Sequence, residues 1–322
     1  MTEFTNFFLR NWILIVILGN FLGALSSVLS KIIVSGSASR KPIEPAPYAF
    51  YSGFFGIVFF LPALILNIWL NFISLSPQSA YIGIIAGTIW ILSLRPLYHV
   101  LTRHEASRVM TIYVATVSFF TFIVTYSFLG ERLGGIQLFA VALLIFGGVL
   151  ASMRQYKNGG LGLKDIGLTV LSGSGIGLGL VLLGISYGLQ GFSTNWQNFL
   201  SGFVWLTGGY FLAAVIFYLW PGQRKIINGR IGKLNWKLFF SEKVPGTLGS
   251  IFIKYAISLT RSATLVNAFE GIKQFFVLIL AGIFSFFYPG VYKEELEGVV
   301  LWQKIIAAAL VFSGIYLLIR NS

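Results

Sequence analysis

The chain has 322 residues, of which 56% are hydrophobic and only 10% are charged, and its formal net charge is +13. A soluble protein of this length needs far more charge to cover its surface, so the composition indicates a protein whose solvent is lipid. The chain has no cysteine, which excludes a disulfide, thiol catalysis and a cysteine-based metal site.

Ten predominantly apolar segments follow one another along the chain, and most of them have the roughly 20 residues that a transmembrane helix needs. They lie near 12–34, 48–71, 79–102, 107–129, 134–152, 165–188, 198–219, 245–260, 263–288 and 299–319. The eighth is short and follows a more polar stretch, KLNWKLFF, which we expect to lie along the membrane interface. The sequence therefore predicts an all-α membrane protein with ten transmembrane helices.

The second half of the chain repeats the first. Residues 137–148, QLFAVALLIFGG, return as 303–314, QKIIAAALVFSG, at a spacing of 166 residues. The glycine pair GxxxG that begins at Gly19 in the first segment returns at Gly175 in the sixth. Duplication of one apolar unit is typical of secondary transporters.

The repeat predicts how the two halves are oriented. Five spans are an odd number, so the second half enters the membrane from the opposite side and the repeats are inverted. We expect residues 1–156 to form the first five-helix repeat and residues 157–322 the second.

The basic residues are distributed unevenly over the two faces of the membrane. With ten spans both chain ends lie on one face, which carries four Lys and Arg, while the opposite face carries sixteen and three lie inside spans. This bias predicts a cytoplasmic basic face and external termini. We expect the basic loops to contact anionic lipid headgroups rather than nucleic acid. The protein is predicted to be a multi-pass integral protein of the cell membrane.

The stretch 97–152 begins LYHVLTRHEASRVMTIYVATV and carries a Gly-Glu-Arg turn at 130–132 before its last helix. It is repeated as YAISLTRSATLVNAFEGIKQFF, from residue 255, and WQKIIAAALVFSG, from residue 302. In order and spacing these stretches resemble the drug/metabolite transporter superfamily in its ten-helix EamA-type form, and the resemblance covers essentially the whole chain. It implies a transporter built from two five-helix repeats. Members of this type usually keep both termini in the cytoplasm, which differs from the charge bias seen here.

Charged residues inside the predicted spans point to a candidate site. A charge at the centre of a bilayer costs about 2.5–3.5 kcal/mol on insertion scales, so such residues indicate function. Glu270 is the only acidic residue that we place within a span, and Lys273 follows on the same helical face. The residues expected to line one polar, substrate-binding chamber between the two halves are Arg95, Tyr98, Tyr113, Lys254, Tyr255, Glu270 and Lys273.

Three interpretations of these charges remain open. Three cations against one carboxylate favour an anionic substrate, such as a carboxylate or a phosphate ester. The segment also resembles the ninth helix of sugar-phosphate and nucleotide-sugar carriers, in which a lysine contacts the phosphate; Lys273 matches it, but Glu270 replaces the asparagine of the triose-phosphate type. Alternatively, Glu270 and Lys273 only neutralise each other while Arg95 and Lys254 reach the interfaces, or Glu270 carries a proton.

Enzymatic functions have little support. The chain has no HExxH motif and no phosphate-binding GxxxxGK[ST] loop, its only aspartate is Asp165, and its only histidines are His99 and His104. We therefore predict no catalytic residues, metal or cofactor.

The sequence thus predicts a secondary transporter, an exporter or exchanger of a small and preferably anionic metabolite, that works by alternating access as a monomer or homodimer. Three alternatives remain. The first is a flippase, or a flippase subunit, for an anionic lipid carrier, and the second is a drug-type cation/H+ exporter that uses Glu270. The third is a membrane interaction protein without transport.

Overall fold

The computed structural model describes residues 12–35, 44–71, 73, 76–104, 106–130, 132, 134–152, 162–192, 194–229, 236–287 and 299–320. Throughout these ranges the regular elements are α-helices, and no strand is present. The helices are α2 (Trp12–Ser35), α3 (Pro45–Phe54), α4 (Gly56–Leu70), α5 (Pro77–Leu101), α6 (Ala106–Phe128), α7 (Gly135–Ser152), α8 (Leu163–Gly188), α9 (Asn195–Leu219), α10 (Gln223–Asn228), α11 (Trp236–Thr260), α12 (Ala263–Ala268), α13 (Glu270–Phe287) and α14 (Val299–Arg320).

The helices coincide with the apolar segments of the sequence. Each of the ten segments falls on one helix or on two consecutive helices. Six stretches are long and apolar enough to cross a membrane: Trp12–Ile33, Pro45–Asn67, Pro77–Leu101, Leu163–Gly188, Asn195–Leu219 and Ala263–Phe284. The prediction of an all-α chain is confirmed, and these helices are those of a membrane protein.

Two of the predicted segments are interrupted. α3 and α4 are separated at Phe55, and α12 and α13 are separated at Phe269. The start of α12 is capped by Ser262, whose hydroxyl accepts a hydrogen bond from the backbone N–H of Leu265 at 3.0 Å. The second break places Glu270 in the first turn of α13.

The eighth segment differs most from its prediction. α11 begins at Trp236 instead of near residue 245, so the stretch expected along the interface is partly helical. Glu242 and Lys243, which we did not expect inside a span, are therefore part of α11. Glu242 is a second acidic residue inside the bundle, only 3% exposed. Because α11 is not one of the six stretches long and apolar enough to cross a membrane, the expectation that Glu270 is the only acidic residue within a span stays a prediction.

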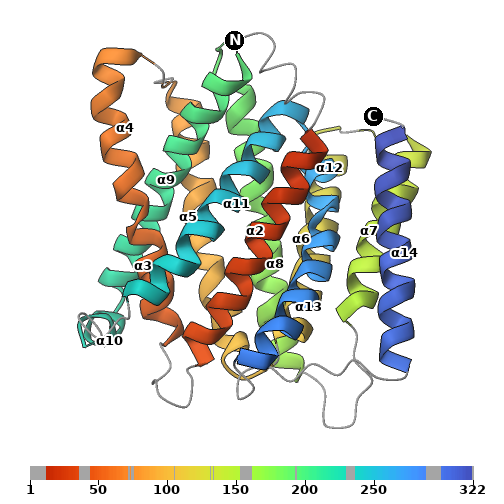
Figure 1. Cartoon of the computed structure of the whole chain (residues 1–322). Helices are drawn as coiled ribbons and strands as arrows, with labels where there is room; N and C mark the ends of the chain where they lie inside the picture. The colour runs from red at the N-terminus through yellow and green to blue at the C-terminus, as the bar shows by residue number, and fades with distance from the viewer. Residues whose placement is uncertain are drawn as a thin grey trace.

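The bundle is held together by close helix crossings (Figure 1). α2 packs along α11, α5 along α8 and α9, and α7 along α14. A Cβ atom added to Gly249 would lie 2.6 Å from the carbonyl oxygen of Gly19, and one added to Gly87 would lie 2.0 Å from the carbonyl oxygen of Leu206. Only glycine lets the two helix backbones come this close. Such close packing holds helices together in lipid, where the hydrophobic effect does not drive their association. Gly188 makes no such approach, because a Cβ there would meet nothing within 4 Å.

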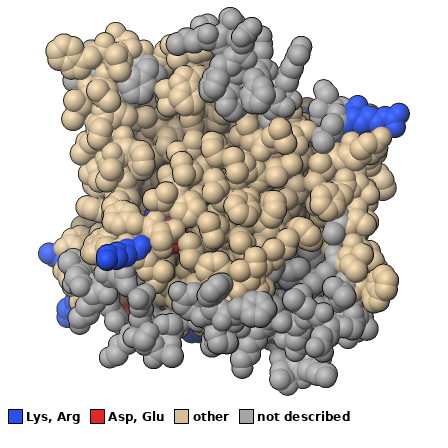
Figure 2. All heavy atoms as spheres, viewed as in Figure 1, with Lys and Arg blue, Asp and Glu red and all other residues tan. Residues whose placement is uncertain are grey.

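The outer surface of the bundle is apolar. Large side chains such as Trp69 (81% exposed) and Phe146 (69%) point outward. Figure 2 shows a face whose middle is covered almost entirely by uncharged residues, with Lys and Arg at its edges. This distribution is expected of a surface in contact with hydrocarbon.

Candidate functional site

A cavity of about 260 Å³, lined by apolar side chains together with several polar and charged ones, lies inside the bundle. Its volume is close to the lower end of the ~300–1,000 Å³ found for small-molecule sites. Five of the residues expected from the sequence line it together: Tyr98, Tyr113, Lys254, Glu270 and Lys273. They come from α5, α6, α11 and α13, on both sides of the predicted boundary between the repeats.

Two of the expected residues lie elsewhere. Arg95 is half-buried on α5 but is not part of the cavity wall. Tyr255 points away from the cavity and packs edge-on against Trp196 and Phe199, with ring centroids 5.5 and 5.2 Å apart. Neighbouring positions on one helix face different directions, so Tyr255 lies beside Lys254 in sequence but not in the cavity.

Lys254 is the most deeply buried cation of the cavity, at 1% exposure. Its Nζ lies 4.2 Å from the centroid of the Trp90 ring and 6.0 Å from that of Tyr210, and it donates a hydrogen bond to the Ser250 hydroxyl. Within the described ranges it forms no ion pair with a carboxylate. Aromatic faces stabilise a cation only partly, so this ammonium group can accept an anionic partner.

A second lysine lies near Lys254 and is paired. Lys273 Nζ lies 3.2 Å from Glu270 Oε2 on the same face of α13. Gly23 of α2 leaves room for the lysine chain, since a Cβ atom there would lie 3.4 Å from Lys273 Cε. Lys273 and Glu270 both act electrostatically on Lys254.

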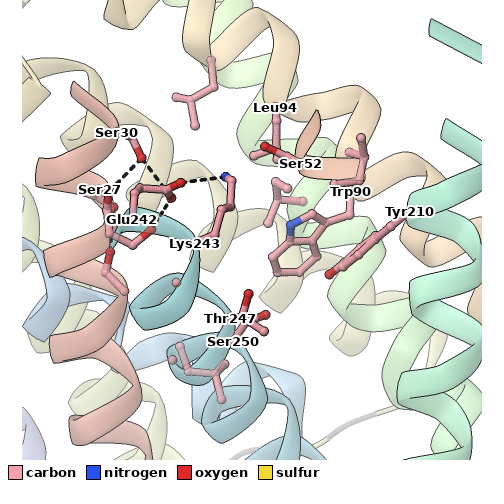
Figure 3. Close-up of a pocket in the computed structure, with 18 of the residues that line it drawn as sticks. Ser27, Ser30, Ser52, Trp90, Leu94, Tyr210, Glu242, Lys243, Thr247 and Ser250 are labelled. Carbon is pink, nitrogen blue, oxygen red and sulfur yellow. Dashed lines mark hydrogen bonds and ion pairs between the residues drawn. The ribbon is translucent and has the colours of Figure 1, made fainter. Parts of the chain in front are cut away.

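A second ion pair, which the sequence analysis did not identify, also belongs to the cavity wall; its carboxylate, that of Glu242, is buried. Glu242 accepts hydrogen bonds from Tyr48 at 2.6 Å, from Ser26 at 2.6 Å and from Ser30 at 3.3 Å. It also pairs with Lys243 at 2.9 Å. Figure 3 shows this carboxylate between the serines of α2 and the amine of Lys243. The cluster joins α2, α3 and α11 at one point.

A helical face of α11 explains the position of Glu242. Glu242, Gly246 and Gly249 recur at spacings of four and three residues, so they share the face that packs on α2. A Cβ atom on Gly246 would lie 2.5 Å from the Ser26 hydroxyl. This spacing was visible in the sequence, but the more polar stretch KLNWKLFF before it was expected to lie along the membrane interface.

The cavity wall contains more basic than acidic side chains. Its wall contains three lysines, Lys243, Lys254 and Lys273, and two glutamates, Glu242 and Glu270, so one positive charge is left over when all are ionised. In a partly enclosed, poorly solvated site such a surplus attracts an anion more strongly than it would in water.

Hydrogen bonds join the helices at the end of the bundle where α5 and α9 begin and α6 and α8 end, which is the upper end in Figure 1. Gln190 donates to the Ser79 hydroxyl, and the Ser201 hydroxyl donates to Gln190 Oε1 at 2.5 Å. Thr125 and Thr264 join through their hydroxyls at 2.6 Å. All five side chains are buried, and none of them belongs to the cavity wall.

A further set of bonds ties the lower ends of the helices. Lys31 of α2 donates to the carbonyl oxygens of Leu101 at 2.6 Å and His104 at 2.8 Å, which satisfies the last turn of α5. The His104 ring lies 2.7 Å from the carboxylate of Asp165, in the first turn of α8. These contacts tie the end of α5 and the turn after it to α2 and to α8.

Comparison with known proteins identifies the fold alone. No family model matches the chain, and no curated protein is significantly similar to it. A solved structure described as a crystal structure of a protein superposes with a TM-score of 0.58 at 13% sequence identity, covering 94% of this chain and 94% of that chain. The architecture is therefore shared with another protein over nearly the entire length of both chains.

Proposed function

We propose that the protein is a secondary transporter of the drug/metabolite transporter superfamily, of the ten-helix EamA type. It moves a small anion across the membrane by alternating access between two inverted five-helix repeats. The observation that carries the proposal is the cavity in which Lys254, buried and without an ion-pair partner in the described ranges, lies beside the Glu270–Lys273 pair. Burying a cation inside a membrane protein costs free energy, so its presence there indicates a function.

The helix crossings support the inverted repeat. α2 packs on α11, and their counterparts in the other repeat, α8 and α5, also pack on each other. Repeat-equivalent glycines mark both crossings: a Cβ on Gly19 would lie 2.9 Å from Ile253, and one on Gly175 would lie 2.0 Å from the Ser93 hydroxyl. The two pairs are rigid units of the kind that rock against each other in transporters.

The asymmetry of the cavity supports alternating access. Side chains from the middle and the lower parts of the helices line it, whereas hydrogen bonds join the upper parts. To release a substrate on the upper side, the bundle has to break the bonds made by Gln190 and Thr125 and close the lower side. These bonds join hydroxyl and amide groups without full charges, whose net energy is only about 0.5–1.5 kcal/mol each, so a ligand can offset them.

A thermal-unfolding screen tests the proposal. Purified protein is heated with small carboxylates and phosphate esters, quaternary amines or neutral polyols, and Lys254→Met is compared with wild type. A ligand at 100 times its Kd stabilises the folded state by about 2.7 kcal/mol. We expect stabilisation by an anion in wild type only, with Lys237→Met, a change at an exposed residue of the same helix, behaving like wild type. Stabilisation by amines alone would replace the proposal with a cation exporter that uses Glu270.

A further inference from the structure

The side of the cavity between α4 and α11 leads to the apolar surface of the bundle. Phe59, in the first turn of α4, belongs to the cavity wall and is 46% exposed. Every other residue of the wall is buried or half-buried. The cavity therefore approaches the outside of the molecule at Phe59.

Both α4 and α11 carry apolar side chains that face outward. Val58 of α4 is 54% exposed, and Val244 and Leu248 of α11 are 55% and 44% exposed. Figure 2 shows small red and blue areas recessed among uncharged side chains on one face of the bundle. A surface with this composition lies in hydrocarbon, so the cavity opens here toward lipid.

Helix packing leaves this side open. α4 packs against α3 and α9, and α11 packs mainly along α2. Extensive packing between α4 and α11 is absent from the described residues. Side-chain contact with α11 is made just before α4 begins, where Phe55 packs edge-on against Phe240 with ring centroids 5.4 Å apart.

Polar side chains of α11 line the inner wall. Thr247, Ser250 and Lys254 recur at spacings of three and four residues and all belong to the cavity wall. Figure 3 shows Thr247 and Ser250 across the cavity from Trp90 and Tyr210. A ligand that extends from Phe59 to Lys254 meets hydrocarbon at one end and an ammonium group at the other.

On the basis of the proposed transport function, we propose that the transported anion is an amphiphile that enters sideways from the bilayer, between α4 and α11. Its carboxylate or phosphate head binds at Lys254, and its apolar tail passes Phe59 and stays in contact with lipid. The charge surplus of the cavity selects the head, and the apolar opening selects the tail.

Two phosphate esters, one with an apolar tail and one without, test this inference. The full chain is placed in nanodiscs of zwitterionic lipid, and its thermal unfolding is followed with dodecyl phosphate, with glycerol phosphate and with dodecanol. We expect dodecyl phosphate to stabilise the protein at a concentration at least tenfold lower than glycerol phosphate, and dodecanol to have no effect. The effect of dodecyl phosphate should be lost in Lys254→Met and kept in Lys237→Met.

The other outcomes separate the inference from the proposed function. Equal stabilisation by glycerol phosphate and dodecyl phosphate would overturn lateral entry and leave an anion transporter in place. Stabilisation by dodecanol as well would show that only the tail is bound, which overturns the inference. The absence of stabilisation by either phosphate would count against both.

A second measurement does not depend on the lysine variants. The chain has no cysteine, so Thr247→Cys introduces a unique thiol into the cavity wall. Labelling this thiol with N-ethylmaleimide adds a bulky group that narrows the proposed route from Phe59 to Lys254. We expect the labelled protein to bind dodecyl phosphate at least tenfold more weakly. Ile279→Cys, at a 45% exposed position of α13, is the matched control and should bind it unchanged after labelling. Unchanged binding in labelled Thr247→Cys would contradict the inference.

Discussion

Replacement of Glu242 tests how the lower part of the bundle is held together. In Glu242→Ala the hydroxyl of Tyr48, a side chain with 0% exposure, loses its acceptor, and Lys243 loses its counter-ion. Removing one partner of a buried ion pair typically costs about 3–5 kcal/mol, because the other charge stays buried. We expect a loss of unfolding free energy in that range.

Conservative and double variants separate the contributions to this loss. Glu242→Gln keeps the shape and the acceptor oxygen but removes the charge, so we expect a smaller loss of about 1–3 kcal/mol. In Glu242→Ala/Lys243→Met no charge is stranded, and the loss should be smaller than in Glu242→Ala alone, with a coupling of about 0.5–3 kcal/mol.

The measurement is equilibrium unfolding in mixed micelles by titration with sodium dodecyl sulfate, followed by tryptophan fluorescence. A value for Glu242→Ala within ~0.5 kcal/mol of wild type, which is the range of an ordinary surface substitution, would refute the buried cluster.

Three further predictions concern stability. Tyr48→Phe should lower the unfolding free energy by about 1.5–3 kcal/mol, the value of a hydrogen bond to a charged group. Tyr187→Phe removes a buried hydroxyl that has no hydrogen-bond partner and should be neutral or stabilising. Equal losses in the two variants would contradict the bond from Tyr48 to Glu242. Gly87→Ala should destabilise the protein by about 1–3 kcal/mol through overpacking. In Gly184→Ala the Cβ would meet only one methyl group at 3.9 Å, so this variant should be neutral or gain up to about 1 kcal/mol of helix propensity. The reverse order of stability in thermal unfolding would contradict the crossing of α5 and α9. Lys31→Met should lose about 1–3 kcal/mol, because the carbonyl oxygens at the end of α5 are left without their donor, and an unchanged unfolding free energy would show that this cap is not needed.

The sequence predicted the helices well because long apolar segments leave few other structures in lipid. It did not predict the interruption at Phe55, since neither Phe55 nor Gly56 differs in hydropathy from a continuous span. It also placed the start of α11 too late, because the hydropathy of the stretch around Glu242 is that of an interface. Glu242 is compatible with a buried helix only through Tyr48 and the serines of α2, which are distant in sequence.

The candidate site was predicted in part. Glu270 and Lys273 share a helical face, and Lys254 was found because a cation inside an apolar segment is rare. Trp90 and Tyr210, which face Lys254, were not identified, because the chain has 8 Trp and 14 Tyr and the sequence does not distinguish these two from the rest. Their selection depends on how α5, α9 and α11 cross, which is a property of the packed bundle.

Transport by the cavity around Lys254 is tested most directly by electrical recording on supported membranes. Proteoliposomes are exposed to jumps in glycerol phosphate or dodecyl phosphate concentration, with protein-free liposomes as the blank. We predict a transient current in wild type and in Lys237→Met that is absent in Lys254→Met. Equal currents in wild type and Lys254→Met, or no current above the blank in wild type, would contradict the proposed anion transport.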